Sequence, residues 1–188
     1  MTDYVTVKKL GEVDVGNYVH LFQSLDESDW MYWEDRYGMK AKSHENVLTL
    51  PLAMVSNPDI QSKDMSYPSS PTELFEKYYD PVFFGELTTL LNNTLGDGYF
   101  INITFDLLKG QSEIVKHVDM FPTIAYNNRV HVPIITNESV SFYNEPDYVW
   151  MDEGEVYLID NTLPHSVING GSDRIHLVVD WHVIRRDI

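Results

Sequence analysis

The sequence contains no cysteine among its 188 residues. This absence excludes disulfides, thiolate zinc sites and cysteine nucleophiles, so any bound metal must take its ligands from nitrogen and oxygen atoms. Basic residues are also scarce, because 13 Lys and Arg stand against 29 Asp and Glu and give a formal net charge of -16. Nucleic acids and anionic membrane surfaces would be repelled by such a charge, and we expect neither as a partner.

Long apolar runs are missing as well. No stretch approaches the length that crosses a membrane, and the N-terminal sequence "MTDYVTVKKLGEVDVG" lacks the apolar segment of a signal peptide. We therefore expect a cytoplasmic protein. A chain of 188 residues that is 43% hydrophobic can build one well-packed core, and we predict a single domain over residues 1–188.

The first part of the chain, residues 1–98, is predicted to be a helical and irregular support region. The segment "DVGNYVHLFQSL" has apolar residues at helical spacing, and "SPTELFEKYYDPVFFGELTTLLNNTLGDG" predicts helix that is interrupted near Asp80-Pro81 and ends at Gly96. Between these segments, "LPLAMVSNPDIQSKDMSYPSSP" is rich in Pro, Ser and Asn and predicts a long surface loop or lid.

The second part, residues 99–188, consists of short β-like runs separated by turn residues. The eight runs are "YFINITFDLL", "EIVKHVD", "RVHVPIIT", "SVSFYNE", "DYVWMD", "EVYLID", "HSVING" and "RIHLVVDWHVI". Such spacing is typical of a sandwich or barrel. Helices followed by eight strands favour an all-β core with N-terminal helices, in the form of a double-stranded β-helix, the jelly roll of cupin-like proteins.

Three side chains in these runs are candidate metal ligands. Residues two apart on a strand point to the same face, so His117 and Asp119 point the same way, and His165 begins another strand after the turn "DNTLP". Two histidines and one aspartate can cover one face of an octahedral metal and leave three positions open, which suits non-heme Fe(II). The alternative is structural, because a His-x-Asp pair is common by chance and Asp119 could simply fix the tautomer of His117.

Arginines accompany these residues. Arg174 stands at the start of an otherwise apolar strand, and its planar guanidinium matches a carboxylate bidentately, so it could clamp the far carboxylate of 2-oxoglutarate. Its alternative is a surface ion pair with Asp173 or another acid. Arg129 and His131 share parity in "RVHVPII", whose apolar character favours an inward orientation for both over a solvent-facing one.

Two segments resemble a known family. "HVDMFPTIAYNNRVHVPI" followed by "WMDEGEVYLIDNTLPHSVINGGSDRIHLVVDW" resembles the catalytic domain of the aspartyl/asparaginyl β-hydroxylases, which are Fe(II)/2-oxoglutarate-dependent oxygenases. The resemblance covers residues 99–183, makes residues 99–188 the catalytic core, and is most specific in residues 154–180. It implies that His117 and His165 bind the metal and that Arg174 holds the distal carboxylate of 2-oxoglutarate. Arg129 and His131 correspond to the pair near the metal-proximal end of that co-substrate.

One departure from the family pattern concerns Asp119. The best-known animal members lack the acidic ligand that Asp119 supplies here, so the sequence is similar to a triad-bearing branch that also resembles bacterial free-amino-acid hydroxylases. The resemblance implies a hydroxylase that uses Fe(II), 2-oxoglutarate and O2 and releases succinate and CO2. Its substrate would be peptidyl Asp or Asn, or a free amino acid such as proline.

Two other functions remain open from the residues. A cupin-type metal enzyme would share the triad without using 2-oxoglutarate, and it would not need Arg174 or Arg129. A non-catalytic jelly-roll binding module would use the same histidines only for structure and would bind no metal.

Overall fold

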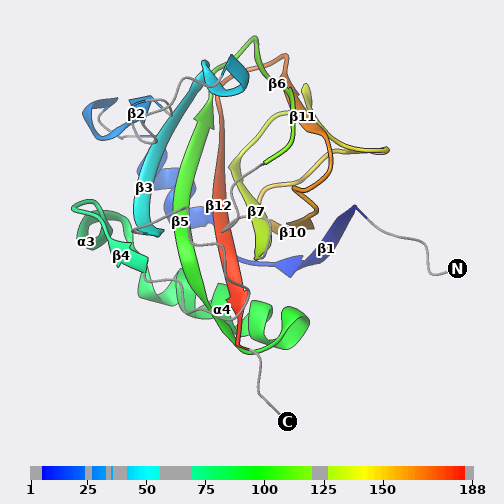
Figure 1. The fold of residues 1–188 in the computed structure, drawn as a ribbon. Helices are drawn as coiled ribbons and strands as arrows, with labels where there is room; N and C mark the ends of the chain where they lie inside the picture. Colours follow the sequence, from blue (N-terminus) through cyan, green and yellow to red (C-terminus); the bar gives the residue numbers. More distant parts are fainter. Residues whose placement is uncertain are drawn as a thin grey trace, which may run out of the picture.

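Two antiparallel sheets form the centre of the described part of the protein (Figure 1). The computed structural model describes residues 6–23, 27–32, 35, 42–55, 69–119 and 127–184. The larger sheet has eight strands in the order β1-β10-β7-β12-β5-β3-β2, with β4 beside β3, and the smaller has the order β6-β11-β8-β9. The strands are β1 (Val7–Glu12), β2 (Met31–Tyr32), β3 (Val47–Val55), β4 (Ser69–Pro71), β5 (Gly98–Leu108), β6 (Ser112–His117), β7 (Asn128–Ile135), β8 (Val140–Asn144), β9 (Asp147–Val149), β10 (Glu155–Ile159), β11 (His165–Asn169) and β12 (Arg174–Val183).

The eight strands expected after residue 98 are all present, as β5 to β12. The chain passes repeatedly between the sheets in this part, because β5, β7, β10 and β12 belong to the larger sheet and β6, β8, β9 and β11 to the smaller one. The predicted double-stranded β-helix is confirmed. No helix in the described ranges is both long and apolar enough to cross a membrane.

The helices before the β-core also follow the prediction. Among the described residues they are α1 (Gly16–Phe22), α3 (Phe75–Tyr78) and α4 (Pro81–Leu95), with two short 3-10 helices, η1 (Glu27–Asp29) and η2 (Lys42–His44). The interruption before α4 is a helix cap, because the Asp80 carboxylate accepts hydrogen bonds from the backbone amides of Val82 and Phe83. At the other end Gly96 adopts a φ of 108°, a conformation that favours glycine.

The expectation that residues 1–98 are helical and irregular is incomplete, because they also supply strands β1 to β4. The predicted surface loop is wrong at both of its ends: residues 50–55 form most of β3, which lies between β5 and β2, and Ser69–Pro71 form β4, which pairs with β3. The run "VLTLPLAMV" is buried on both faces of the sheet and therefore lacks the alternation that marks a half-exposed strand. Residues 56–68 of the predicted loop lie outside the described residues.

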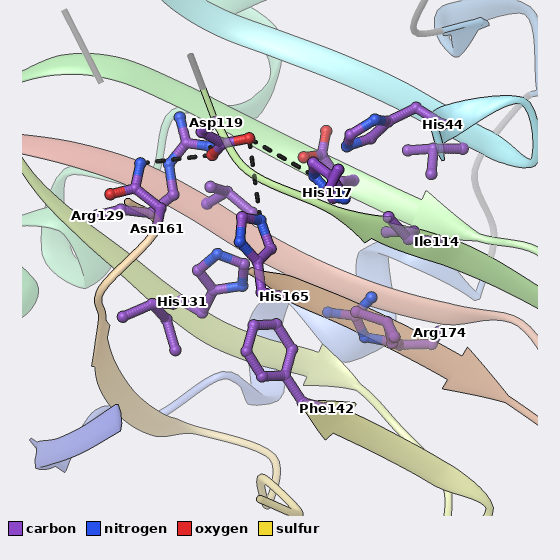
Figure 2. A pocket seen from close by; sticks show the side chains of 15 residues that line it. His44, Ile114, His117, Asp119, Arg129, His131, Phe142, Asn161, His165 and Arg174 are labelled. Atoms are coloured by element: carbon purple, nitrogen blue, oxygen red, sulfur yellow. Dashed lines mark hydrogen bonds and ion pairs between the residues drawn. The ribbon is translucent and has the colours of Figure 1, made fainter. Parts of the chain in front are cut away.

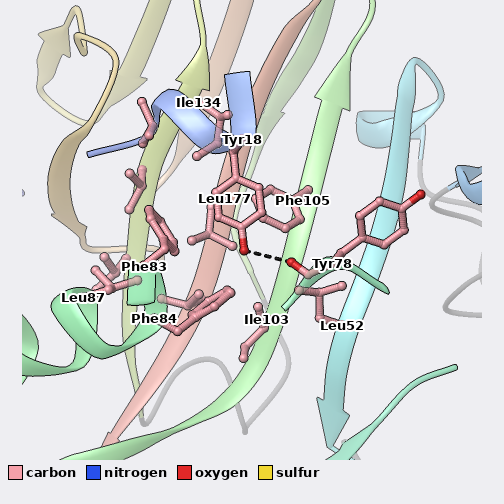
Figure 3. Packing of buried hydrophobic residues seen from close by; sticks show 14 of the residues in the cluster. Tyr18, Leu52, Tyr78, Phe83, Phe84, Leu87, Ile103, Phe105, Ile134 and Leu177 are labelled. Atoms are coloured by element: carbon pink, nitrogen blue, oxygen red, sulfur yellow. Dashed lines mark hydrogen bonds between the residues drawn. The ribbon is translucent and has the colours of Figure 1, made fainter. Parts of the chain in front are cut away.

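One face of the larger sheet packs against α1 and α4 (Figure 3). Tyr18 lies in the middle of this layer, with its ring centroid 4.9 Å from those of Phe83 on α4 and Phe105 on β5. Its hydroxyl donates to the carbonyl of Tyr78 at 2.8 Å and accepts from the amide of Asp80 at 3.1 Å. Apolar side chains fill the space between the sheet and these helices.

The other face of the larger sheet looks toward the smaller sheet. On β12, Ile175, Leu177 and Val179 belong to the apolar layer next to the helices, whereas Arg174 and Val178 line a cavity between the sheets. A second, smaller apolar cluster lies on this side. It comprises Val47, Leu108, Val140, Phe142, Met151, Tyr157, Ile159 and Val167. The alternation of β12 thus places polar side chains inside the β-helix.

Candidate metal centre

Three side chains converge where β6 and β11 meet (Figure 2). His117 ends β6 and is the cross-strand partner of His165 on β11, and their ring centroids lie 4.3 Å apart. The Oδ1 atom of Asp119 lies 3.5 Å from Nε2 of His117 and 3.9 Å from Nε2 of His165. One ligand atom from each of the three residues lies within 4.8 Å of the others, so one ion could contact all of them.

The backbone orients both imidazoles toward this point. Nδ1 of His117 lies 2.8 Å from the carbonyl oxygen of Val115, and Nδ1 of His165 lies 2.9 Å from that of Leu163. A carbonyl oxygen only accepts, so Nδ1 carries the proton and Nε2 keeps its lone pair for a metal. Two neutral imidazoles and one carboxylate are the donor set of a divalent transition metal with open positions, so the residues present fit Fe(II).

Asp119 is kept ionised by its neighbours. Burial would raise the pKa of the Asp119 carboxyl, but the Arg129 guanidinium outweighs this effect and holds that pKa well below its usual range. Nη1 of Arg129 donates to Oδ2 of Asp119 at 2.6 Å, and Nδ2 of Asn161 donates to the same oxygen at 3.4 Å. Burial also lowers the pKa of His165, which favours the neutral imidazole that a metal requires.

Arg174 lies in the same cavity, in the space between the sheets. It is buried, and its Nε has no hydrogen-bond partner among the described residues. Burial lowers the pKa of Arg174 to about 10, opposed by the nearby Asp106 carboxylate, so the guanidinium keeps its charge at neutral pH. The alternative pair with Asp173 is not seen, because Asp173 accepts from Lys109 and from the amide of Gly110 instead.

Arg129 and His131 both line the cavity, from strand β7. The Nδ1 atom of His131 is buried and has no hydrogen-bond partner in the described part of the chain. Figure 2 shows Asp119, His117 and His165 pointing toward one another, with Arg174 set apart from them. The structure therefore brings all six candidate residues of the sequence to one cavity. The buried guanidinium of Arg174 has a donor without a partner among the described residues, which favours the binding of an anion in this cavity.

Sequence reasoning assigned no role to several residues at or beside this site. Asp180 and Asn161 bind Arg129 and Asp119, and His44 comes from η2, far away in the sequence. The His44 ring is 4.7 Å from that of His117 in an edge-to-face contact, and its Nδ1 lies 2.9 Å from the Ser43 hydroxyl. Burial lowers the pKa of His44 to about 3, so this ring is neutral. A single histidine in a polar turn carries no sequence signal.

A buried histidine beside the site predicts that the fold loses stability in mild acid. His176 is 2% exposed and neither ring nitrogen has a partner among the described residues. Burial, helped by Arg174, holds the pKa of His176 well below 6.5, so the folded protein does not bind the proton that the unfolded chain takes up. The contribution of His176 to the free energy of unfolding is fully present above pH ~6.5. Below that pH it falls by about 1.4 kcal/mol for each pH unit.

Urea unfolding at pH about 7.5 and about 5.5 measures this effect. In His176→Leu the free energy of unfolding should depend less steeply on pH than in the wild type. His20→Leu, at an exposed position of α1, should keep the wild-type dependence. Identical pH dependence in the His176→Leu and wild-type proteins would show that His176 is not held neutral.

Comparison with known proteins gives one family and one fold. A family model described as aspartyl/asparaginyl beta-hydroxylase matches residues 82–183, more than half of the chain. Viral collagen prolyl hydroxylase from Paramecium Bursaria Chlorella virus-1, solved as a 2OG complex, has a similar structure, with 10% identity, a TM-score of 0.57 and coverage of 97% of this chain and 98% of that one.

Two bacterial structures are similar as well. A prolyl-4-hydroxylase from Pseudomonas putida has 11% identity, a TM-score of 0.51 and coverage of 96% of this chain and 94% of that chain. A 2OG-Fe(II) oxygenase family oxidoreductase from Burkholderia pseudomallei has 12% identity and a TM-score of 0.56, and the match covers 72% of this chain and 65% of that one. At such identities these likenesses show a shared fold.

Proposed function

Because the chain belongs to the aspartyl/asparaginyl beta-hydroxylase family of Fe(II)/2-oxoglutarate-dependent oxygenases, we propose that it hydroxylates an amino-acid-type substrate. Members of this family use Fe(II) and 2-oxoglutarate. The proposed substrate is a peptidyl Asp or Asn, or a free amino acid such as proline, and the proposed products include succinate and CO2. The observation that carries the proposal is the convergence of two histidines and one carboxylate in a cavity that also contains a buried arginine.

The proposed metal ligands are His117, Asp119 and His165. When bound, Fe(II) and 2-oxoglutarate supply the oxidative chemistry, and the protein supplies ligands, orientation and a water-poor cavity. The two imidazoles offer Nε2 because the backbone holds Nδ1, and the carboxylate is already ionised before metal arrives. Little reorganisation is therefore needed for binding.

The proposed co-substrate residues are Arg174, Arg129 and His131. The buried guanidinium of Arg174 lies apart from the triad and would hold the distal carboxylate of 2-oxoglutarate. Arg129 and His131 would lie beside the carboxylate at the metal end, and the buried Nδ1 of His131 is a polar atom that this ligand could satisfy. A bound dicarboxylate would also offset part of the free-energy cost of burying the charge of Arg174.

Release of succinate from 2-oxoglutarate tests the proposal. We expect the purified protein with Fe(II), ascorbate and O2 to form succinate slowly without substrate and faster when the correct amino acid or peptide is added. Omission of Fe(II) should abolish succinate formation. A cupin-type enzyme that does not use 2-oxoglutarate would bind metal without forming succinate, and a binding module would do neither, so each outcome selects one of the three functions.

A further inference from the structure

Arg129 lies between two carboxylates. Its Nη1 donates to Oδ2 of Asp119 at 2.6 Å, while Nε and Nη2 donate to Oδ1 and Oδ2 of Asp180 at 2.9 and 3.1 Å. The pair with Asp180 is therefore bidentate, the geometry in which a guanidinium is most strongly oriented. Asp180 is 1% exposed, so this pair is protected from water.

Asp180 is itself held in place across the sheet. It is the cross-strand partner of Arg129 on β7 and of Asn102 on β5, so the three residues form a polar row over three adjacent strands. Nδ2 of Asn102 donates to Oδ2 of Asp180 at 2.8 Å, and Oδ1 of Asn102 accepts from the amide of Val55 at 3.0 Å. The row ends at the backbone amide of Val55, so the hydrogen bonds that orient Arg129 are anchored in the sheet itself.

We propose that Asp180 is a positioning residue for the metal centre: through Arg129 it keeps Oδ2 of Asp119 occupied, so that Asp119 offers a metal only Oδ1. The proposal rests on the proposed metal site. The distances agree with it, because Oδ1 is the oxygen that faces Nε2 of His117 and of His165, at 3.5 and 3.9 Å.

Single-oxygen binding matters for the coordination sphere. A carboxylate that binds through both oxygens would fill an additional position of an octahedral metal. With Oδ2 held by a charged hydrogen bond, Asp119 would fill one position of a bound metal, and three positions would stay open beside the two histidines. The row of Asn102, Asp180 and Arg129 would thus act on the metal without touching it, as outer residues commonly do in metal sites.

Asp180→Asn is the direct test, because it keeps the shape of the side chain and removes the charge that orients Arg129. Co(II) binding, followed by calorimetry and by the visible absorption spectrum, reports the metal site without requiring turnover. We expect Asp180→Asn to weaken Co(II) binding by roughly 10- to 100-fold and to alter the spectrum. The matched control is Asp147→Asn, which removes a carboxylate on β9 of the smaller sheet that accepts a hydrogen bond from the Thr6 hydroxyl, and this variant should bind Co(II) as the wild type does.

A double-mutant cycle separates action through Arg129 from a general loss of negative charge. If Asp180 acts through Arg129, then adding Asp180→Asn to Arg129→Gln should change Co(II) affinity by no more than about 2-fold. Additive effects, or wild-type affinity in Asp180→Asn, would overturn the proposal. Should Asp180→Asn fail to fold, Asn102→Ala tests the same row, with a smaller loss of affinity expected and an unchanged affinity contradicting it. A wrong assignment of the metal site would give a different result. In that case the wild-type protein would bind no Co(II), or His117→Ala would bind Co(II) as tightly as the wild type.

Discussion

Replacing His117 with alanine is expected to lower Fe(II) affinity by more than about 100-fold, because changes in the outer residues of a metal site already cost 10- to 100-fold and this change removes a ligand. Succinate formation from 2-oxoglutarate should fall below detection. The fold should survive, since the His117 side chain is 17% exposed and Asp119 keeps its bonds to Arg129 and Asn161. Calorimetry with Co(II) and a succinate assay measure the two effects separately.

A matched control for this variant is His20→Ala. His20 is an exposed histidine on α1, on the helix side of the larger sheet, and its loss should leave metal affinity and turnover unchanged. Wild-type turnover in His117→Ala would mean that the triad does not hold the catalytic metal. Metal binding without any succinate, in the wild type, would instead point to the cupin-type alternative.

The β-core could be predicted because its strands carry their own signal. β5 to β12 are short runs bounded by turn residues, and the alternation of polar and apolar residues on β12 shows which side chains face the helices. Arg174, which stands at the start of this strand, is buried in the cavity between the sheets. Local patterns were sufficient here.

The strands before residue 98 could not be predicted in the same way. β3 is an almost continuous apolar run, which periodicity cannot distinguish from a buried helix or a compact loop. β1 contains Lys8, Lys9 and Gly11, which do not mark a strand. It pairs with β10, which lies far along the chain, and Val7 is opposite Ile159. Tertiary pairing rather than local preference makes these segments strands.

Part of the candidate site could likewise be predicted from local sequence, and part of it depends on how distant strands pair. The parity of His117 and Asp119 is local, and the turn before His165 is a sequence feature, so the sequence could predict that the three converge. The partnership of Arg129 with Asp180 depends on the register of β7 against β12, which no short motif contains. Sequence reasoning assigned Arg129 to the co-substrate alone, whereas the structure also shows its guanidinium bonded to two carboxylates.

Arg174→Lys is expected to raise the 2-oxoglutarate concentration for half-maximal turnover by roughly 10- to 100-fold, because a hydrogen bond to a charged group contributes about 1.5–3 kcal/mol. Lysine keeps the positive charge and continues to balance the Asp106 carboxylate, but it loses the planar fork that matches a carboxylate. For this reason the lysine variant separates recognition from charge burial better than an alanine variant would.

Two measurements give this prediction its control. Co(II) affinity should stay at the wild-type value in Arg174→Lys, because no hydrogen bond of the described residues joins Arg174 to the triad, whereas loss of both affinities would indicate a damaged fold. Asp173→Asn removes the acid that would pair with Arg174 at the surface but that contacts Lys109 and Gly110 instead, so it should leave co-substrate dependence unchanged. If Arg174→Lys also keeps wild-type dependence on 2-oxoglutarate, the buried guanidinium does not bind the co-substrate and serves only to balance Asp106 within the β-helix.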